Sequence, residues 1–187
     1  MKKIILFLSA ITFSIAGFSQ SPTFQKSDLV FNAGIGFGSS LYGSAYTTTL
    51  PAISISGEYG VIDDFITDDM TLGIGGYVGF AGSKYEYSGF GTTYGWKYNY
   101  TVIGARGALH YPLVDKLDTY AGLMLGYNVV SFKEIGTAPL GITNSQSGGM
   151  TFSAYLGARY YLANNFAVMA ELGYGIAYLN VGIALKI

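Results

Sequence analysis

Apolar residues alternate with small or polar residues in eight separate segments of this chain, and that period of two limits the possible folds more than any other feature. In the segment 179–187, Leu179, Val181 and Ile183 alternate with Asn180 and Gly182. Successive side chains of a β-strand point to opposite faces of the sheet, so this alternation predicts strands with one apolar face. The predicted strands are 29–38, 53–59, 72–80, 103–111, 120–129, 152–161, 166–174 and 179–187.

The distribution of apolar and charged residues indicates which face of these strands lies outside. Charged residues make up 11% of the chain and hydrophobic residues 50%, whereas a soluble domain usually carries about 25% charged residues. A soluble barrel would turn the face of glycine and small polar residues outward, but a bilayer favours apolar residues outside and polar residues inside. After the first 20 residues, no apolar run approaches the roughly 20 residues that a spanning helix needs. The sequence therefore predicts an all-β protein that crosses a membrane with strands.

Aromatic residues and connection lengths agree with this prediction. Aromatic girdles are typical of the two interfaces of a membrane barrel. Long connections at 39–50, 83–95 and 133–149 alternate with short ones at 112–117 and 163–165, although 61–69 is long for a periplasmic turn and 175–178 is short for an external loop. We predict an eight-stranded antiparallel transmembrane β-barrel, closed by its first and last strands, with a polar lumen filled by side chains. Its predicted girdles are Tyr59, Tyr111, Tyr160 and Phe166 at one end, and Phe37, Phe80, Tyr127, Phe152 and Tyr174 at the other.

The first residues have the features of a secretory signal peptide. Lys2 and Lys3 precede an apolar stretch from Ile4 to Ile15, and small residues follow up to Ser19. This arrangement predicts cleavage between Ser19 and Gln20. The expected organisation is a signal peptide at 1–19, a short N-terminal segment at 20–27 and a barrel at 28–187, exported to the outer membrane of a Gram-negative cell. The leader resembles those of exported proteins of the Bacteroidetes.

The segment Asp28–Ile187 resembles the small eight-stranded outer-membrane proteins of the OmpA/OmpX type and the related outer membrane protein β-barrel domain family. The resemblance lies in the strand rhythm, the loop asymmetry and the run Val181–Ile187. That run looks like the C-terminal signal read by the outer-membrane assembly machinery, although family members most often end in Phe or Trp. The resemblance implies an integral outer-membrane protein whose partners are that machinery, outer-membrane lipid and lipopolysaccharide.

Several kinds of chemistry are not expected. The absence of Cys excludes disulfides and thiolate metal sites, and the absence of a Lys/Arg cluster disfavours nucleic acid as a partner. Glycine-rich runs such as 34–38 lack the Lys-Ser/Thr that follows a phosphate loop, so no cofactor is predicted. Four acidic residues at 63, 64, 68 and 69 could attract calcium, but their spacing matches no EF-hand loop, and a solvated acidic turn is the favoured interpretation.

Charged residues on the predicted inner face suggest an internal network. Either they form a gate or an ion path, or they neutralise one another in a buried and structural network, which is favoured because uncompensated buried charge is costly. Arg159 and Glu171 are expected to pair diagonally around the turn 163–165. His110 also points inward, but no Ser or acid partner is evident in the sequence, so no catalytic residue is predicted. The predicted network comprises Glu58, Arg106, Arg159, Glu171 and Lys186.

The connection from Lys84 to Trp96 is both aromatic and polar, which suits a recognition loop because Tyr and Trp give contact area at low entropic cost. It could also be a β-extension of the two adjoining strands, and the two interpretations are compatible. The favoured function is a non-catalytic outer-membrane barrel with a structural or surface-interaction role and an unknown external ligand. The alternatives are an enzyme that modifies lipid A or phospholipid, a small pore, and a secreted lipocalin-like carrier. The possible recognition residues are Tyr85, Tyr87, Phe90, Tyr94 and Trp96.

Overall fold

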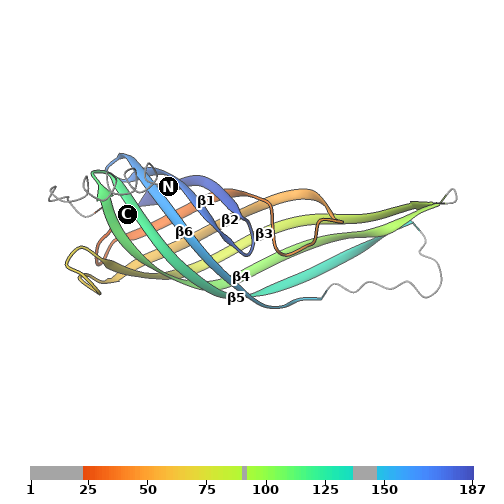
Figure 1. Ribbon diagram of the computed structural model, residues 1–187, viewed down its shortest axis with the longest axis horizontal. Helices are drawn as coiled ribbons and strands as arrows, with labels where there is room; N and C mark the ends of the chain where they lie inside the picture. The colour runs from red at the N-terminus through yellow and green to blue at the C-terminus, as the bar shows by residue number, and fades with distance from the viewer. Residues whose placement is uncertain (1–22, 90–91, 137–146) are drawn as a thin grey trace, which may run out of the picture.

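The computed structural model describes residues 23–89, 92–136 and 147–187. The described residues form eight antiparallel strands, each paired with its neighbours in the chain, and the last strand pairs with the first to close a barrel (Figure 1). The predicted all-β, eight-stranded antiparallel fold is therefore confirmed. The strands are β1 (Leu29–Phe37), β2 (Thr47–Ile62), β3 (Thr71–Gly89), β4 (Thr92–Val114), β5 (Leu117–Gly136), β6 (Gly149–Ala163), β7 (Phe166–Tyr174) and β8 (Leu179–Lys186).

Closure of the barrel rests on the pairing of β1 with β8. Their register runs without interruption from Val30 opposite Lys186 to Phe37 opposite Leu179. An open edge in lipid would leave backbone N–H and C=O groups without partners, at a cost of several kcal/mol for each group. In the described part of the chain, no helix is long and apolar enough to cross a membrane.

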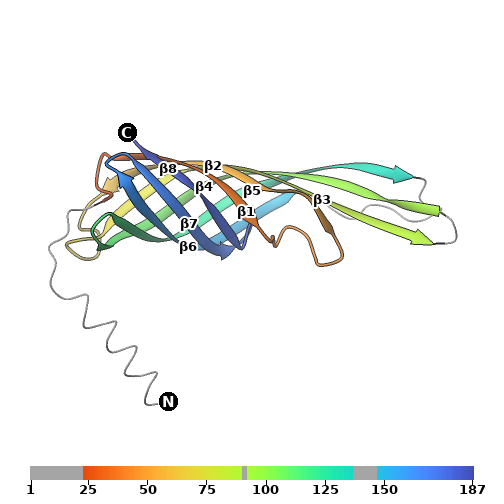
Figure 2. The same ribbon diagram turned by 90° about the horizontal axis from the view of Figure 1, so that it is seen from above.

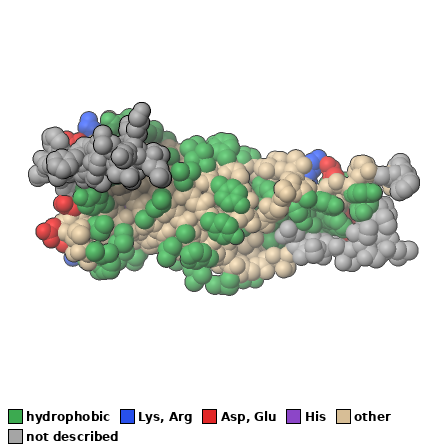
Figure 3. All heavy atoms as spheres, in the orientation of Figure 1, with side chains coloured by type: hydrophobic (Ala, Val, Ile, Leu, Met, Phe, Trp, Pro, Cys, Tyr) green, Lys and Arg blue, Asp and Glu red, His purple; other side chains and the backbone are tan. Residues whose placement is uncertain are grey.

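Burial follows the predicted alternation and is inverted relative to a soluble protein. Leu123 is 57% exposed and Ile183 is 49% exposed on the outer face, whereas the inward Val30 and Ala167 are fully buried. Figure 3 shows hydrophobic side chains spread over the outside of the barrel, with charged side chains gathered toward its two ends. An apolar outer surface of this kind is matched to lipid rather than to water.

Three strands are much longer than a membrane requires. Strands β3, β4 and β5 contain 19, 23 and 20 residues, against about 9–11 residues for a spanning strand. At one end they continue as a sheet well beyond the rest of the barrel (Figures 1 and 2). We call this sheet the extension and this end the extension end. The β-extension predicted for the segment from Lys84 to Trp96 is confirmed for its described residues.

The opposite end of the barrel, which we call the turn end, carries the short connections. The connection predicted at 112–117 is shorter than expected, because β4 continues to Val114 and β5 begins at Leu117. Lys116 adopts a positive φ of 65° in the resulting tight turn. The difference matters for the lumen, because it places Asp118, which precedes the predicted strand 120–129, inside β5.

The N-terminal segment enters the barrel at the turn end. Phe24 is 2% exposed and its ring lies 4.0 Å from the His110 ring, centroid to centroid. Lys186 Nζ donates to the Thr23 carbonyl at 3.2 Å, and the Ser27 N–H donates to the Gly60 carbonyl. The sequence predicted only a short segment here and gave no sign that it fills the mouth. The predicted leader at 1–19 lies outside the described residues and stays a prediction.

Candidate functional site

A four-residue cluster lies in the lumen near the turn end and joins four strands. Arg159 on β6 contacts Glu58 on β2 at 2.5 Å and Asp118 on β5 at 3.0 Å. His110 on β4 lies between the same two carboxylates, with Nε2 at 2.8 Å from Glu58 and Nδ1 at 2.9 Å from Asp118. All four side chains are almost completely buried. We call these residues the lower cluster.

The lower cluster is electrically balanced when His110 is an imidazolium. Both of its ring nitrogens face carboxylate oxygens, and only the protonated ring donates from both nitrogens. Two positive groups, Arg159 and His110, then offset the two negative groups, Glu58 and Asp118. Because an unpaired charge in a dry interior is costly, this balance explains how four ionisable side chains are tolerated there.

A second charged layer lies closer to the extension end. Arg106 on β4 donates from Nη2 to Glu171 on β7 at 2.7 Å and from Nε to the Tyr155 hydroxyl at 2.8 Å. The Tyr120 hydroxyl donates to the same Glu171 oxygen at 2.9 Å. The Tyr120 ring also lies 4.5 Å from the Arg159 guanidinium carbon, so it separates the two layers. We call Arg106, Glu171, Tyr155 and Tyr120 the upper cluster.

The structure brings four of the five predicted network residues into these clusters, but not in the predicted pairing. The expected Arg159–Glu171 pair is wrong: Arg159 lies opposite Met169 as predicted, yet its guanidinium turns across the lumen to Glu58 and Asp118, and Glu171 binds Arg106. The fifth residue, Lys186, instead pairs with Asp28 at the mouth, at 3.3 Å.

Sequence reasoning missed Asp118 and therefore the acid partners of His110. The available signal was the alternation itself, because stepping back by two from the inward Tyr120 reaches Asp118. The predicted strand begins at 120, whereas β5 begins at Leu117, and this difference hides that step. Glu58 lies 52 residues from His110 and could be paired with it only through the three-dimensional register. Within the described ranges, no group of three or more His, Cys, Asp or Glu side chains is arranged to hold a metal ion.

The clusters leave little free space in the barrel interior. A cavity of about 40 Å³ lies beside Arg106 and Glu171, between Ser54, Tyr77 and Met124, which is room for a few water molecules. A larger hollow of about 740 Å³ lies on the outer, lipid-facing side of the wall, and apolar residues such as Leu72, Leu109, Leu123 and Leu156 line it. Side chains therefore occupy most of the lumen around the two clusters.

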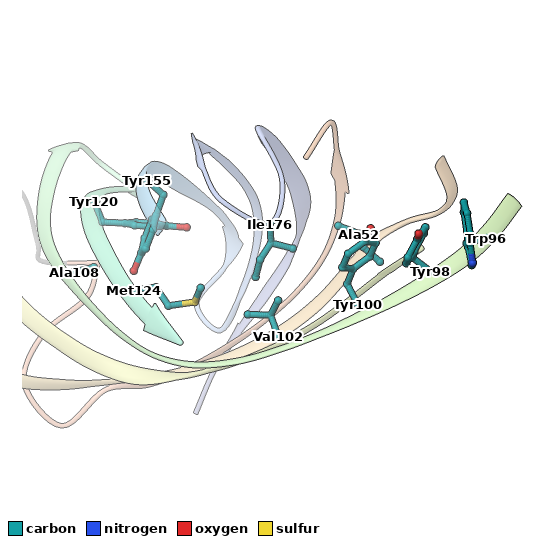
Figure 4. Packing of buried hydrophobic residues seen from close by; sticks show 11 residues of the cluster. Ala52, Trp96, Tyr98, Tyr100, Val102, Ala108, Tyr120, Met124, Tyr155 and Ile176 are labelled. Atoms are coloured by element: carbon teal, nitrogen blue, oxygen red, sulfur yellow. The ribbon is translucent and has the colours of Figure 1, made fainter. Parts of the chain in front are cut away.

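Aromatic side chains line the inner face of the extension and form a second candidate site. Trp96, Tyr98 and Tyr100 follow one another along β4 (Figure 4). The connection between β1 and β2 folds over them: the Tyr46 ring lies 5.7 Å from that of Tyr98 and 5.6 Å from that of Tyr85. The Ser83 and Tyr100 hydroxyls are hydrogen-bonded at 3.1 Å. The lower part of the extension is thus a packed aromatic core rather than an open surface.

The predicted recognition residues divide between this core and the surface. Trp96 is only 6% exposed, whereas Tyr87 is 47% exposed. Tyr87 and Tyr94 face each other across β3 and β4, with ring centroids 5.4 Å apart, and Tyr85 is half-buried under Tyr46. Phe90 lies outside the described residues. The period of two in Trp96, Tyr98 and Tyr100 supports a β-extension, but sequence reasoning did not single out the supporting residues Tyr42 and Tyr46.

A closed barrel with an apolar outside, a charged and filled lumen and a tall sheet at one end defines the class of small transmembrane β-barrels. The outer membrane protein OprG of Pseudomonas aeruginosa superposes with a TM-score of 0.52 at 10% identity, covering 89% of this chain and 99% of that chain. The attachment invasion locus protein Ail of Yersinia pestis gives 0.46 at 13% identity, covering 87% and 96%. The N-terminal β-barrel domain of Pseudomonas aeruginosa OprF gives 0.43 at 18% identity, covering 88% and 100%.

At these identities the comparisons concern the fold. The likeness to OprG confirms an outer-membrane barrel fold of the small eight-stranded kind to which the sequence showed its resemblance. No protein-family model matches the chain. No curated protein matches it either.

Proposed function

We propose that this chain is a non-catalytic barrel of the outer membrane that presents its extension to the outside of the cell as an interaction surface. The observation that carries the proposal is the asymmetry of the barrel. Three strands with an aromatic inner face rise far beyond the bilayer at one end, whereas at the other end the β4–β5 and β6–β7 connections are tight turns and Phe24 fills the mouth. Long external structures and short periplasmic turns are the rule for such barrels.

The arrangement of polar groups supports a non-catalytic role. A hydrolase of lipid A or phospholipid would need a nucleophile and base that reach lipid. His110 is instead buried in the lumen between Glu58 and Asp118 and packed under Phe24. Its nitrogens are engaged by carboxylates, which leaves neither of them to activate a hydroxyl group. The filled lumen likewise favours an interaction role over a pore.

The tip of the extension is the part suited to contact a partner. Tyr87 and Tyr94 lie beyond the packed aromatic core, and Tyr87 is about half-exposed. Rigid aromatic side chains on a paired sheet lose little entropy on binding, which is why Tyr is common in recognition surfaces. The ligand belongs outside the cell, where this tip would project.

The topology is tested by epitope insertion in cells. A tag between Gly89 and Thr92 should be stained by antibody on intact cells. A tag between Asp115 and Lys116, in the β4–β5 turn, should be stained only after the outer membrane is permeabilised. The reverse pattern, or fractionation of both proteins into the soluble periplasm, would contradict the proposal.

The interaction role is tested by adhesion. Cells that express the wild-type chain, a Tyr87→Ser/Tyr94→Ser variant or no chain are compared for attachment to surfaces coated with extracellular-matrix protein, polysaccharide or bacterial envelope. On at least one coating, we expect cells with the wild-type chain to attach more strongly than cells without it. On that coating, attachment should fall severalfold in the variant at equal surface expression. A Tyr59→Ser variant, changed at the turn end, is the matched control and should attach like the wild type. Identical attachment with and without the chain on every coating would remove the support for an interaction role.

A further inference from the structure

Three lysines lie side by side on the outer face of the extension, one on each of its strands. Lys84 on β3 is directly opposite Lys97 on β4, and Lys97 is directly opposite Lys133 on β5. Directly opposed residues on adjacent strands have Cβ atoms about 4.5–5.5 Å apart, and like charges in such positions are destabilising. We call these three residues the lysine row.

The lysine row contains every Lys and Arg residue that lies outside the predicted leader, the lumen and the turn end. Of the ten Lys and Arg residues in the sequence, two belong to the predicted leader, two are the lumenal arginines and three are Lys26, Lys116 and Lys186 at the turn end. The remaining three all fall in this one register row. A scattered set of solubilising charges would not be expected to coincide in this way, so the row indicates a site for an anion.

The positive charge of the row is only partly compensated within the chain. Lys84 forms an ion pair with Glu86 on the same face. Glu134, the residue after Lys133, is directly opposite the inward Trp96 and so belongs to the inner face. Among the residues that the structure describes, the side chains of Lys97 and Lys133 have no hydrogen-bond or ion-pair partner, and both residues are exposed. The outer face therefore keeps two unpaired ammonium groups beside each other.

The height of the row along the barrel identifies the kind of anion. Lys84 follows Phe80, a member of the predicted aromatic girdle, by four residues, and Phe80 is 47% exposed on the lipid-facing side. Four residues correspond to about 13 Å along a strand, or about 10 Å along the membrane normal for a strand tilted by about 40°. Lysine side chains can bend back by several ångströms toward the interface. Their ammonium groups then reach the level of lipid headgroups, on the face that meets lipid.

We propose that the lysine row binds the phosphate of an outer-leaflet lipid headgroup, such as the phosphorylated glucosamine of lipid A. This rests on the proposed outer-membrane function and deepens it by naming one partner and its site. Bound phosphate would remove the repulsion along the row, because one dianionic group can accept hydrogen bonds from two or three adjacent ammonium groups. The lipid would thereby fix the height and tilt of the extension relative to the membrane surface.

The proposal is tested by lipid binding to the chain purified from membranes into maltoside micelles, which contain no phosphate. Native mass spectrometry measures the apparent Kd for diphosphoryl lipid A and for the same lipid A after enzymatic removal of its phosphates. We expect the wild-type chain to prefer the phosphorylated lipid, and Lys97→Gln/Lys133→Gln to raise its Kd about tenfold or more. The matched control is Lys26→Gln/Lys116→Gln, which removes the same charge from two exposed lysines at the turn end and should change the Kd less than twofold.

Three outcomes would overturn the proposal: equal binding of the two lipids by the wild type, an equal loss in the control variant, or no loss in the lysine-row variant. A separate measurement adds inorganic phosphate at about 10 mM, roughly a hundredfold excess over the lipid, because two ligands of one site compete by simple mass action. Complete displacement of the lipid would assign the row to soluble phosphate instead. Heat-modifiable migration of each variant on a gel verifies folding. Because the assay uses purified protein, its failure is distinct from a failure of the epitope test in cells.

Discussion

Arg159 and Glu58 lie on strands four apart in an eight-stranded ring, and their side chains meet across the full width of the barrel at 2.5 Å. Arg159 is also held by Asp118 on the adjacent strand, where the two residues are directly opposed. The pair therefore ties opposite walls of the barrel together. A second side-chain link joins the same walls through Arg106 on β4, which donates to Ser56 on β2 and to Tyr155 on β6.

We predict that Arg159→Met lowers the free energy of unfolding by about 3–5 kcal/mol, because two buried carboxylates lose their guanidinium partner. Urea unfolding in lipid vesicles gives this value. A double-mutant cycle of Arg159→Met with Glu58→Gln should show a coupling energy of at least about 1 kcal/mol. The cycle of Arg159→Met with Glu171→Gln is the control and should show a clearly smaller one, because Tyr120 separates these two groups. Equal couplings would mean that the lumen pairs its charges differently.

The sequence was sufficient for the fold but not for this pairing, for a physical reason. Alternation fixes which face each residue occupies, so Glu58, Arg106, Arg159 and Glu171 were placed inward from the sequence alone. Which carboxylate an inward arginine reaches depends on strand tilt and on side chains from the opposite wall. The Arg159–Glu171 prediction considered only the neighbouring strand, whereas a guanidinium in a narrow barrel can span the lumen.

The ends of the strands were the other source of error. Alternation weakens where outer residues leave the bilayer, because polar side chains become acceptable on both faces. The sequence of this segment is therefore compatible with both a recognition loop and a β-extension. The row of Lys84, Lys97 and Lys133 cannot be seen in the sequence, because it exists only through the register of three strands. The same uncertainty at the turn end hid Asp118.

We predict opposite tolerance at two adjacent residues of β5. Leu123 is 57% exposed to lipid near mid-strand, whereas Met124 is 4% exposed and points into the lumen. Leu123→Arg should destabilise the barrel by about 2–4 kcal/mol, the cost of a cation near the bilayer midplane. Met124→Gln, in a polar interior, should cost much less in the same vesicle unfolding titration. Equal effects would show that the two faces have been assigned wrongly.

We predict a similar contrast at two adjacent glycines of β3. A Cβ added at Gly75 would clash with the Gly57 carbonyl oxygen, whereas one added at Gly76 would meet nothing within 4 Å. Gly75→Ala should therefore destabilise the barrel by about 1–3 kcal/mol through overpacking against backbone. Gly76→Ala should be neutral or slightly stabilising, because alanine restricts the unfolded chain. Comparable unfolding midpoints for the two variants would contradict the close approach of β2 and β3.

Heat-modifiable migration is expected because the strands close into a ring of paired backbone groups. Unboiled wild-type protein should run on a gel at a different position from boiled protein. Ile183 of β8 is paired with Ala33 on one side and Val168 on the other. Ile183→Pro removes a backbone donor there and should abolish the difference in migration. Ile183→Leu, at the same lipid-facing position, should retain it. A proline variant that still shifts on boiling would argue against closure through β8.

The last prediction concerns conduction, and we expect none from the wild-type chain in a planar bilayer. The lumen is crossed at two levels, by Arg159 with Glu58 and by Arg106 with Glu171, and the cavity beside the second level is only about 40 Å³. Phe24 covers the turn end, but the two charged levels are enough to block conduction. Phe24→Ala should therefore show no channel openings either. Single-channel recording at symmetric salt and at both polarities measures whether either protein conducts. Steady openings of Phe24→Ala alone would make the N-terminal segment the seal, and steady openings of the wild type would restore the pore as the function of the barrel.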